Sequence, residues 1–376
     1  MRIAVDARTV FTAHRRGTGK NLVDLYRHMA VLRPAWRILM FHQYEAGGNP
    51  FADLPNVETR RIDIRGDRLN LWQQVRLPLA AWRAGASVLH CPANTAPRFP
   101  LVPMVLTLHD LLPFDPELAT KQDARWSGNI AAAARRAARI IVPSRFTCGQ
   151  IVKKLGVSTD NITVNPWAAD SGCRRVTDPG ELGRVRAKYG LADERRYVLA
   201  LGSSDKRKNT VGILEAWAVV PDRLRSQISL LAVGIPDPAL DGFARRAREL
   251  DVASSVVLGG FADETDLSAL ISGAEVLCYP SLGEGFGLPV LDGFACETAV
   301  LTSSVSSLPE VAGDAAWLVD PADRRAIAAG LVRLLDDQRL RNELVQRGRV
   351  RASEFTWRAC AETACRVFEQ AARERT

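Results

Sequence analysis

Residues 275–299 read EVLCYPSLGEGFGLPVLDGFACETA, and this stretch decides the fold. It opens with an apolar, β-prone run, Glu275 to Pro280, and closes with Leu288 to Cys296, whose apolar residues recur at helical spacing. The glycines between the two runs lack a Cβ, so backbone amides there can approach a ligand closely. A helix N-terminus also presents unpaired N–H groups and a partial positive charge. The stretch therefore predicts a strand, a turn and a helix that together form a seat for a diphosphate.

Two carboxylates bracket this turn. Glu284 precedes the predicted helix, and Asp292 lies about one turn inside it. Ionised carboxylates accept hydrogen bonds, so they suit sugar hydroxyls. The residues alone also allow a plainer interpretation, an ordinary strand–turn–helix unit whose glycines serve the turn and whose carboxylates face solvent.

The string EGFGLPVLD at 284–292 closely resembles the E-G-F-G-L-P-x-x-E signature of glycosyltransferase family 4, the retaining transferases of GT-B fold. The resemblance implies that the first acid and the amides after it contact the donor sugar and diphosphate, and that the second acid binds the ribose hydroxyls. The chain departs from the signature at the second acid, where aspartate replaces glutamate. The implied donor contacts are Glu284, Gly285, Phe286, Gly287, Leu288 and Asp292.

Strand-like runs alternate with helix-length amphipathic segments along the whole chain. This alternation predicts an α/β protein with two Rossmann-like domains, each a doubly wound parallel sheet. The resemblance implies the GT-B arrangement, in which the two domains face an interdomain cleft. We expect an acceptor-binding domain at 1–175, a donor-binding domain at 176–355 and a C-terminal helix at 356–376 that crosses back to the first domain.

Residues 199–217, LALGSSDKRKNTVGILEAW, again read as a strand, a polar loop and a helix. Three cations stand at the helix entrance, where positive charge opposes the helix dipole unless an anion lies between them. The matching family segment has the form G-x-x-x-x-R-K-N, which implies that Lys208 contacts the donor diphosphate. Some family members carry an arginine where this chain has Ser203, and the resemblance implies a donor contact at this position. Two alternatives stay open for the missing charge: Arg207 supplies it, or leaving-group stabilisation rests mainly on Lys208 and the backbone amides.

A glycine-rich loop, RRGTGKN at 15–21, follows the first predicted strand. It lacks the first glycine and the Ser or Thr that a Walker A loop requires, so an NTPase is disfavoured. In family 4 the corresponding turn faces the donor phosphates, which implies this role for Gly17 and Gly19. The resemblance also implies that Phe261, after the third strand of the second domain, lies beside the nucleobase.

The run Met104 to Phe114, MVLTLHDLLPF, delivers His109 and Asp110 to the C-terminal end of a buried strand, where open α/β sheets bind ligands. A single histidine in such a place can also be structural. The run resembles the HD segment of bacterial family 4 transferases, whose histidine reaches the sugar. The expected catalytic residues are therefore His109, Asp110, Lys208 and Glu284.

The composition suits two domains of ordinary size, with 376 residues of which 47% are hydrophobic. The seven cysteines include no CxxC pair and the five histidines no HExxH motif, so we expect reduced thiols, no metal site and no cofactor. No apolar run is long enough to span a bilayer, and Met1 leads directly into a strand, so no signal peptide or membrane helix is expected. These features predict a cytoplasmic protein.

Positive charge is concentrated in the first half of the chain. Residues 1–175 hold 25 of the 50 Lys and Arg residues but only 13 of the 42 Asp and Glu residues. This excess suggests an anionic partner, such as a lipid-linked acceptor or the inner face of the cell membrane, although it also fits solvating surface charge. Nucleic acid is disfavoured, because no basic strand with interleaved aromatic residues and no helix-turn-helix pattern is present.

The resemblance to family 4 implies a hexosyltransferase that retains the anomeric configuration, and we expect it to work without a metal ion. By the resemblance, the donor is a nucleotide sugar, with GDP-mannose favoured, and the acceptor is a glycan or lipid-linked sugar in bacterial polysaccharide or O-antigen synthesis. Two alternatives stay open, a UDP-sugar-dependent transferase acting on a small molecule and a non-catalytic sugar-nucleotide-binding protein of the same fold. A dinucleotide-dependent oxidoreductase is disfavoured, because it would need a GxGxxG motif after the first strand of its domain.

Overall fold

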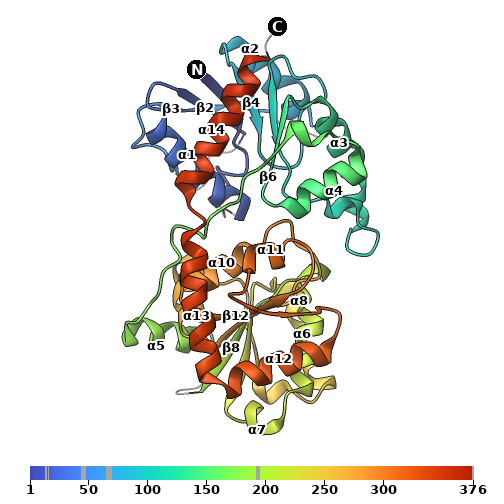
Figure 1. Cartoon of the computed structure of the whole chain (residues 1–376), viewed down its shortest axis with the longest axis vertical. Coiled ribbons are helices and arrows are strands. Elements are labelled where there is room, and N and C mark those ends of the chain that lie inside the picture. Colours follow the sequence, from blue (N-terminus) through green and yellow to red (C-terminus); the bar gives the residue numbers. More distant parts are fainter. Residues whose placement is uncertain (13–14, 16, 44–47, 65–69, 192–194, 375–376) are drawn as a thin grey trace. The chain divides into compact units, whose positions relative to one another are not determined.

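A computed structural model describes residues 1–12, 15, 17–43, 48–64, 70–191 and 195–374 (Figure 1). The chain divides into two compact units, one of Met1–Trp167 with Phe355–Thr376 and one of Ala168–Glu354. The first unit thus ends at Trp167 and not at residue 175 as expected. The reason is that the following segment already bonds to the second unit: the Arg175 guanidinium donates to Ser272 O at 2.6 Å and the Val176 N–H donates to Ser272 Oγ at 2.9 Å.

The first unit is built on a seven-stranded parallel sheet of order β3-β2-β1-β4-β5-β6-β7. Helix α14 is contributed by the C-terminal end of the chain and packs on α1, β4, β5 and β6. The elements of this unit are β1 Arg2–Asp6, α1 Gly17–Leu32, β2 Arg37–His42, β3 Val57–Arg61, the π-helical turn η1 Trp72–Arg76, α2 Leu77–Arg83, β4 Val88–Cys91, β5 Met104–Thr107, η2 Leu112–Phe114, α3 Lys121–Arg136, β6 Arg139–Val142, α4 Arg145–Leu155, η3 Thr159–Asn161, β7 Ile162–Val164 and α14 Trp357–Arg373.

The second unit is built on a six-stranded parallel sheet of order β10-β9-β8-β11-β12-β13. Its elements are α5 Pro179–Lys188, β8 Arg196–Leu201, η4 Lys206–Lys208, α6 Thr210–Val219, α7 Asp222–Arg225, β9 Ile228–Val233, α8 Asp237–Glu249, η5 Ala253–Ser255, β10 Val256–Leu258, α9 Glu264–Ser272, β11 Val276–Tyr279, α10 Leu288–Ala295, β12 Ala299–Ser303, α11 Leu308–Ala312, β13 Trp317–Val319, α12 Arg324–Asp336 and α13 Gln338–Ser353. The predicted α/β class with two parallel sheets is confirmed.

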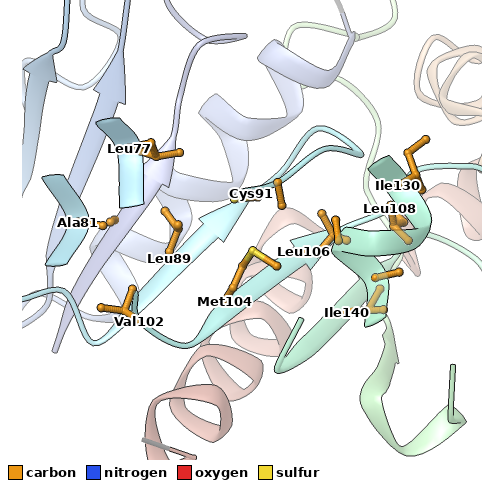
Figure 2. Packing of buried hydrophobic residues seen from close by; sticks show 14 of the residues in the cluster. Leu77, Ala81, Leu89, Cys91, Val102, Met104, Leu106, Leu108, Ile130 and Ile140 are labelled. Atoms are coloured by element: carbon orange, nitrogen blue, oxygen red, sulfur yellow. The ribbon is translucent and has the colours of Figure 1, made fainter. Parts of the chain in front are cut away.

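Each sheet is covered by amphipathic helices that bury their apolar stripes against it. In the first unit Leu77 and Ala81 of α2 point toward Leu89 of β4 and Met104 of β5 (Figure 2). In the second unit a separate core joins β8, β9 and β11 to α6 and α12. Burying both faces of a parallel sheet explains why its strands read as continuous apolar runs in the sequence.

The strand orders also predict where ligands bind. The order reverses between β1 and β4 in the first sheet and between β8 and β11 in the second. Crevices at the carboxyl ends of such strand pairs are the usual ligand sites of open α/β sheets. The loops after β8 and β11 contain residues 202–209 and 280–287, which hold most of the donor residues predicted from the sequence.

Candidate active site

The two loops at the β8/β11 switch point are fastened to each other. The Arg207 carbonyl accepts a hydrogen bond from the Leu282 N–H at 2.7 Å, and the Ser281 hydroxyl oxygen lies 2.7 Å from the same carbonyl oxygen. The Asn209 amide donates to Pro280 O at 3.0 Å and to Pro321 O at 2.8 Å. These bonds hold the 206–208 turn against the glycine-rich loop, so the predicted cations and carboxylate share one site.

Glu284 is the centre of this site. Its carboxylate is buried and accepts from Lys208 Nζ at 2.8 Å, Arg207 Nη1 at 2.7 Å, Tyr279 OH at 2.6 Å and Ser281 Oγ at 2.8 Å. Lys208 Nζ also contacts Tyr279 OH. We refer to Glu284, Lys208, Arg207, Tyr279 and Ser281 as the Glu284 cluster.

The charges in the Glu284 cluster stabilise one another. Burial opposes ionisation of Glu284, but Lys208 and Arg207 lower its pKa to about 2. Burial would lower the pKa of Arg207, yet the Glu284 carboxylate raises it overall. At neutral pH the site therefore holds an ionised carboxylate between two cations.

The glycine-rich turn has a fixed backbone. Gly287 has φ of 110°, and a Cβ there would lie 2.5 Å from Leu308 Cδ2, so this position requires glycine. The Ser307 hydroxyl lies 2.9 Å from Glu284 O and 2.8 Å from Phe286 O. These two contacts orient both carbonyl groups of the turn toward Ser307. Helix α10 starts at Leu288, directly after the turn (Figure 1). The diphosphate seat expected at its N-terminus stays a prediction.

Asp292 lies within the second turn of α10 and is buried. Its Oδ1 accepts from the Asp170 N–H at 3.0 Å. The carboxylate thus fixes the chain where it enters the second unit. Its predicted contact with ribose stays a prediction.

Two other donor predictions fall on the loops beside the cluster. Ser203 holds the β8–α6 loop in shape, since its N–H donates to Thr210 Oγ1 at 2.9 Å and its carbonyl accepts from the same hydroxyl at 2.8 Å. Phe261 follows β10 and is 63% exposed. Strand β10 is the edge strand of the sheet and is separated from β8 by β9. An exposed aromatic ring there is available to a ligand, and its predicted place beside a nucleobase stays a prediction.

The residues predicted in the first unit lie at the carboxyl ends of its strands. His109 Nε2 lies 2.6 Å from Pro92 O, so the neutral ring donates from Nε2 and presents Nδ1 as an acceptor. The ring meets Trp167 edge-on at 5.0 Å, and burial lowers the pKa of His109. Asp110 Oδ1 accepts from the Leu112 N–H at 3.1 Å. His109 is therefore neutral and held in one orientation at neutral pH.

The N-terminal glycines open helix α1. A Cβ on Gly19 would lie 2.2 Å from Thr9 O, so this glycine lets the helix approach the loop after β1. Gly17 is exposed at the start of the helix, and a Cβ added there would meet no described atom within 4 Å. Their predicted role toward donor phosphates stays a prediction.

The family model described as "Glycosyl transferases group 1" matches residues 183–351, which span the sheet and the Glu284 cluster of the second unit. The second unit of the chain belongs to the group 1 glycosyl transferases. This transferase is 28% identical over 372 residues to the O-antigen chain mannosyltransferase B of Escherichia coli, and the match covers 94% of this chain and 96% of that protein.

A second relative of the transferase is the MMP alpha-(1->4)-mannosyltransferase of Mycolicibacterium hassiacum, 30% identical over 285 residues, or 72% of this chain and 66% of that protein. Among solved structures, the transferase is similar to WaaG, a glycosyltransferase involved in lipopolysaccharide biosynthesis. The TM-score is 0.78 at 16% identity over 98% of this chain and 99% of that one. The family resemblance read from residues 284–292 and the GT-B fold are confirmed.

Three side chains that shape the site belong to no motif in the sequence. Tyr279 and Ser281 complete the shell around Glu284, and Ser307 fixes the turn. Tyr279 lies within an apolar strand pattern, so it reads as a core residue. The only sequence signal was its position at the end of a strand that enters a glycine-rich turn.

The described part of the transferase contains no group of three His, Cys, Asp or Glu side chains placed to hold a metal ion. Within the same residues, no helix combines the length and apolar character needed to cross a bilayer.

Proposed function

We propose that this transferase moves a hexose from a nucleoside-diphosphate sugar to a glycan or lipid-linked acceptor in bacterial polysaccharide or O-antigen synthesis, with retention of anomeric configuration. The observation that carries the proposal is the Glu284 cluster, in which Lys208 and Arg207 lie within 2.8 Å of one buried carboxylate beside the N-terminus of α10. This arrangement offers two cations and helix amides to a diphosphate.

The chemistry requires charge stabilisation above all. Breaking the bond between the anomeric carbon and the phosphate oxygen leaves negative charge on the β-phosphate, and preorganised cations and amides lower the energy of that charge. Lys208, Arg207 and the amides at the start of α10 supply such groups. We therefore propose a reaction that does not depend on a metal ion, in which the departing phosphate accepts the acceptor's proton.

The geometry of the Glu284 cluster suggests how the nucleotide sugar is received. The carboxylate accepts hydrogen bonds from four side chains, two of which are the cations Lys208 and Arg207. A diphosphate competes for the two cations because it carries more charge. Their movement toward the phosphates frees Glu284 to accept from the sugar hydroxyls, so diphosphate binding and sugar recognition are linked.

The remaining site residues have narrower roles in the proposal. Asp292 binds the ribose, Phe261 lies beside the base, and Gly17 and Gly19 approach the phosphates. The neutral His109, with Asp110 beside it, meets the sugar. Since the Nε2–H of His109 donates to Pro92 O, Nδ1 is the ring atom that accepts a hydrogen bond from a sugar hydroxyl.

GDP-mannose is the proposed donor. The support comes from the relatives, because the E. coli and M. hassiacum proteins are both named as mannosyltransferases. We propose a cytoplasmic enzyme that contacts the inner face of the membrane, where lipid-linked acceptors are presented. A UDP-sugar donor with a small-molecule acceptor is the alternative.

The test is turnover with a panel of nucleotide sugars, read as released nucleotide, followed by NMR of the product's anomeric configuration. GDP-mannose is expected to give the highest kcat/KM, an α-linked product and rates unchanged by EDTA. Preference for a UDP-sugar would correct the donor, and an inverted product would overturn the retaining mechanism. Absence of turnover with every donor, together with nucleotide-dependent thermal stabilisation, would favour the non-catalytic binding protein.

A further inference from the structure

One face of the first unit carries exposed apolar side chains on a helical segment. The segment formed by η1 and α2 turns Leu77 and Ala81 toward the core (Figure 2). Its other face exposes Leu71, Val75 and Trp82 by 45%, 44% and 54%. These three positions are spaced by four and seven residues, so they form one stripe along the helix.

The apolar stripe continues onto the loop that precedes β5. The Gln74 side chain joins the two, since it donates to Ala96 O at 3.2 Å and accepts from the Arg98 N–H at 2.9 Å. Beyond that junction the loop exposes Phe99 by 71% and Leu101 by 48%. We call Leu71, Val75, Trp82, Phe99 and Leu101 the docking surface. Exposed apolar groups gathered in this way mark an interaction site.

Arginines flank the docking surface. Arg60, Arg76 and Arg83 line a cavity of about 510 Å³, together with Phe41 and Ile62. Over Phe99, the Arg136 guanidinium lies 4.7 Å from the ring centroid. The surface therefore combines apolar rings with cations on its border.

The charge of these arginines is largely uncompensated. Glu58 pairs with Arg60 at 3.0 Å but also with Arg37 at 2.9 Å, so one carboxylate serves two cations. Across the described ranges of the chain, neither Arg76 nor Arg83 has an ion pair or a side-chain hydrogen bond. Two guanidinium groups beside an open cavity are suited to bidentate binding of phosphate oxygens.

We propose that the docking surface lies on an anionic lipid bilayer, with Trp82 and Phe99 at the level of the headgroups and Arg76 and Arg83 against their phosphates. Aromatic side chains favour the membrane interface, and a helix with an apolar face and basic flanks binds there in the plane of the bilayer. A second copy of the chain fits poorly. A two-fold contact through this face would place uncompensated arginines close to one another.

This inference names the surface that makes the membrane contact of the proposed function. It rests on the proposed function in one respect, because the lipid-linked acceptor is the reason for binding a membrane. Its test is vesicle co-sedimentation of the full chain, which requires no turnover. We expect the protein to sediment with phosphatidylglycerol-containing vesicles and not with pure phosphatidylcholine, and to be released by salt.

Matched variants locate the contact. The double variant Arg76→Gln, Arg83→Gln should weaken vesicle binding by about 30-fold, from roughly 5-fold for each arginine near the surface. The control Arg245→Gln, Arg248→Gln makes the same charge change on the exposed face of α8 in the second unit and should bind like wild type. For the apolar part, Val75→Ser should lower binding by about tenfold. Val219→Ser, at a valine 52% exposed in α6, should leave binding unchanged.

Three results would overturn the inference. The wild-type protein could fail to sediment with phosphatidylglycerol vesicles, it could bind phosphatidylcholine vesicles equally well, or the control variants could bind vesicles as weakly as the variants of the docking surface and its arginines. Self-association in the ultracentrifuge that Val75→Ser abolishes would assign the surface to a second copy instead. Donor turnover with a soluble acceptor is measured in parallel. Intact turnover without vesicle binding contradicts this inference alone, and vesicle binding without turnover contradicts the proposed function alone.

Discussion

Replacing Lys208 with alanine tests the proposed leaving-group site most sharply. Lys208 Nζ lies 2.8 Å from Glu284 Oε1 and contacts Tyr279 OH, so its side chain is held within the Glu284 cluster. A preorganised donor that stabilises leaving-group charge contributes about 10²- to 10³-fold to the rate, or roughly 3–4 kcal/mol of barrier. The kcat of Lys208→Ala at saturating donor should fall by that factor.

The same substitution should leave the protein folded. Glu284 keeps Arg207 Nη1 at 2.7 Å and the Ser281 hydroxyl at 2.8 Å, so its buried charge is not left unpaired. The losses are the charge-assisted hydrogen bond to Glu284 and the contact with Tyr279 OH, both from a side chain that is 20% exposed. We expect a decrease of about 1–3 kcal/mol in the free energy of unfolding, which urea denaturation measures.

Two further variants control the experiment. Lys206→Ala removes an exposed lysine from the same turn and should keep near-normal kcat. Lys208→Arg keeps the charge and should recover part of the lost rate. Normal turnover in folded Lys208→Ala, or an equal loss in Lys206→Ala, would refute the reasoning.

Three predictions concern stability. Tyr279→Phe removes the hydroxyl that donates to Glu284 Oε1 at 2.6 Å and should lower the free energy of unfolding by about 1.5–3 kcal/mol; an unchanged urea midpoint would contradict the hydrogen-bonded cluster. Gly287→Ala places a Cβ 2.5 Å from Leu308 Cδ2 at a positive φ and should cost more than about 1 kcal/mol, whereas Gly242→Ala, in α8 with nothing within 4 Å, should be neutral or stabilising by up to about 1 kcal/mol. Equal thermal midpoints for Gly287→Ala and Gly242→Ala would contradict this prediction, because they would show that the turn adjusts to the added Cβ without loss of stability. Burial lowers the pKa of His90 from 6.5 to about 3. The neutral ring therefore makes its full contribution to the free energy of unfolding above pH 6.5, and this contribution falls by up to about 1.4 kcal/mol per pH unit as the pH drops toward 3. Urea titrations between pH 4 and 7 should show this slope in wild type and a flatter one in His90→Gln.

The fold could be predicted because its signals are local. The strand expected at 275–280 and the helix expected at 288–296 appear as Val276–Tyr279 and Leu288–Ala295. Both follow from apolar periodicity and from the glycines between them. The end of the first unit was misplaced because the 168–176 segment is held by distant partners such as Ser272, which no local pattern reveals.

The site was only partly predictable. The motifs placed Lys208 and Glu284 in one donor site, but their direct contact joins residues 76 positions apart and follows from the β8–β11 pairing. Tyr279 could not be singled out, because a tyrosine in an apolar strand is normally a core residue. The docking surface was hidden for a related reason. Residues 71–82 are apolar on several sides, so the sequence does not tell which side is buried.

The most direct test of the central claim is a crystal structure of the transferase with GDP-mannose or GDP. The account predicts that the diphosphate lies at the N-terminus of α10, with its oxygens within hydrogen-bonding distance of Lys208 Nζ and with Glu284 turned toward the sugar. A diphosphate bound elsewhere, with the Lys208–Glu284 pair intact and untouched, would contradict it.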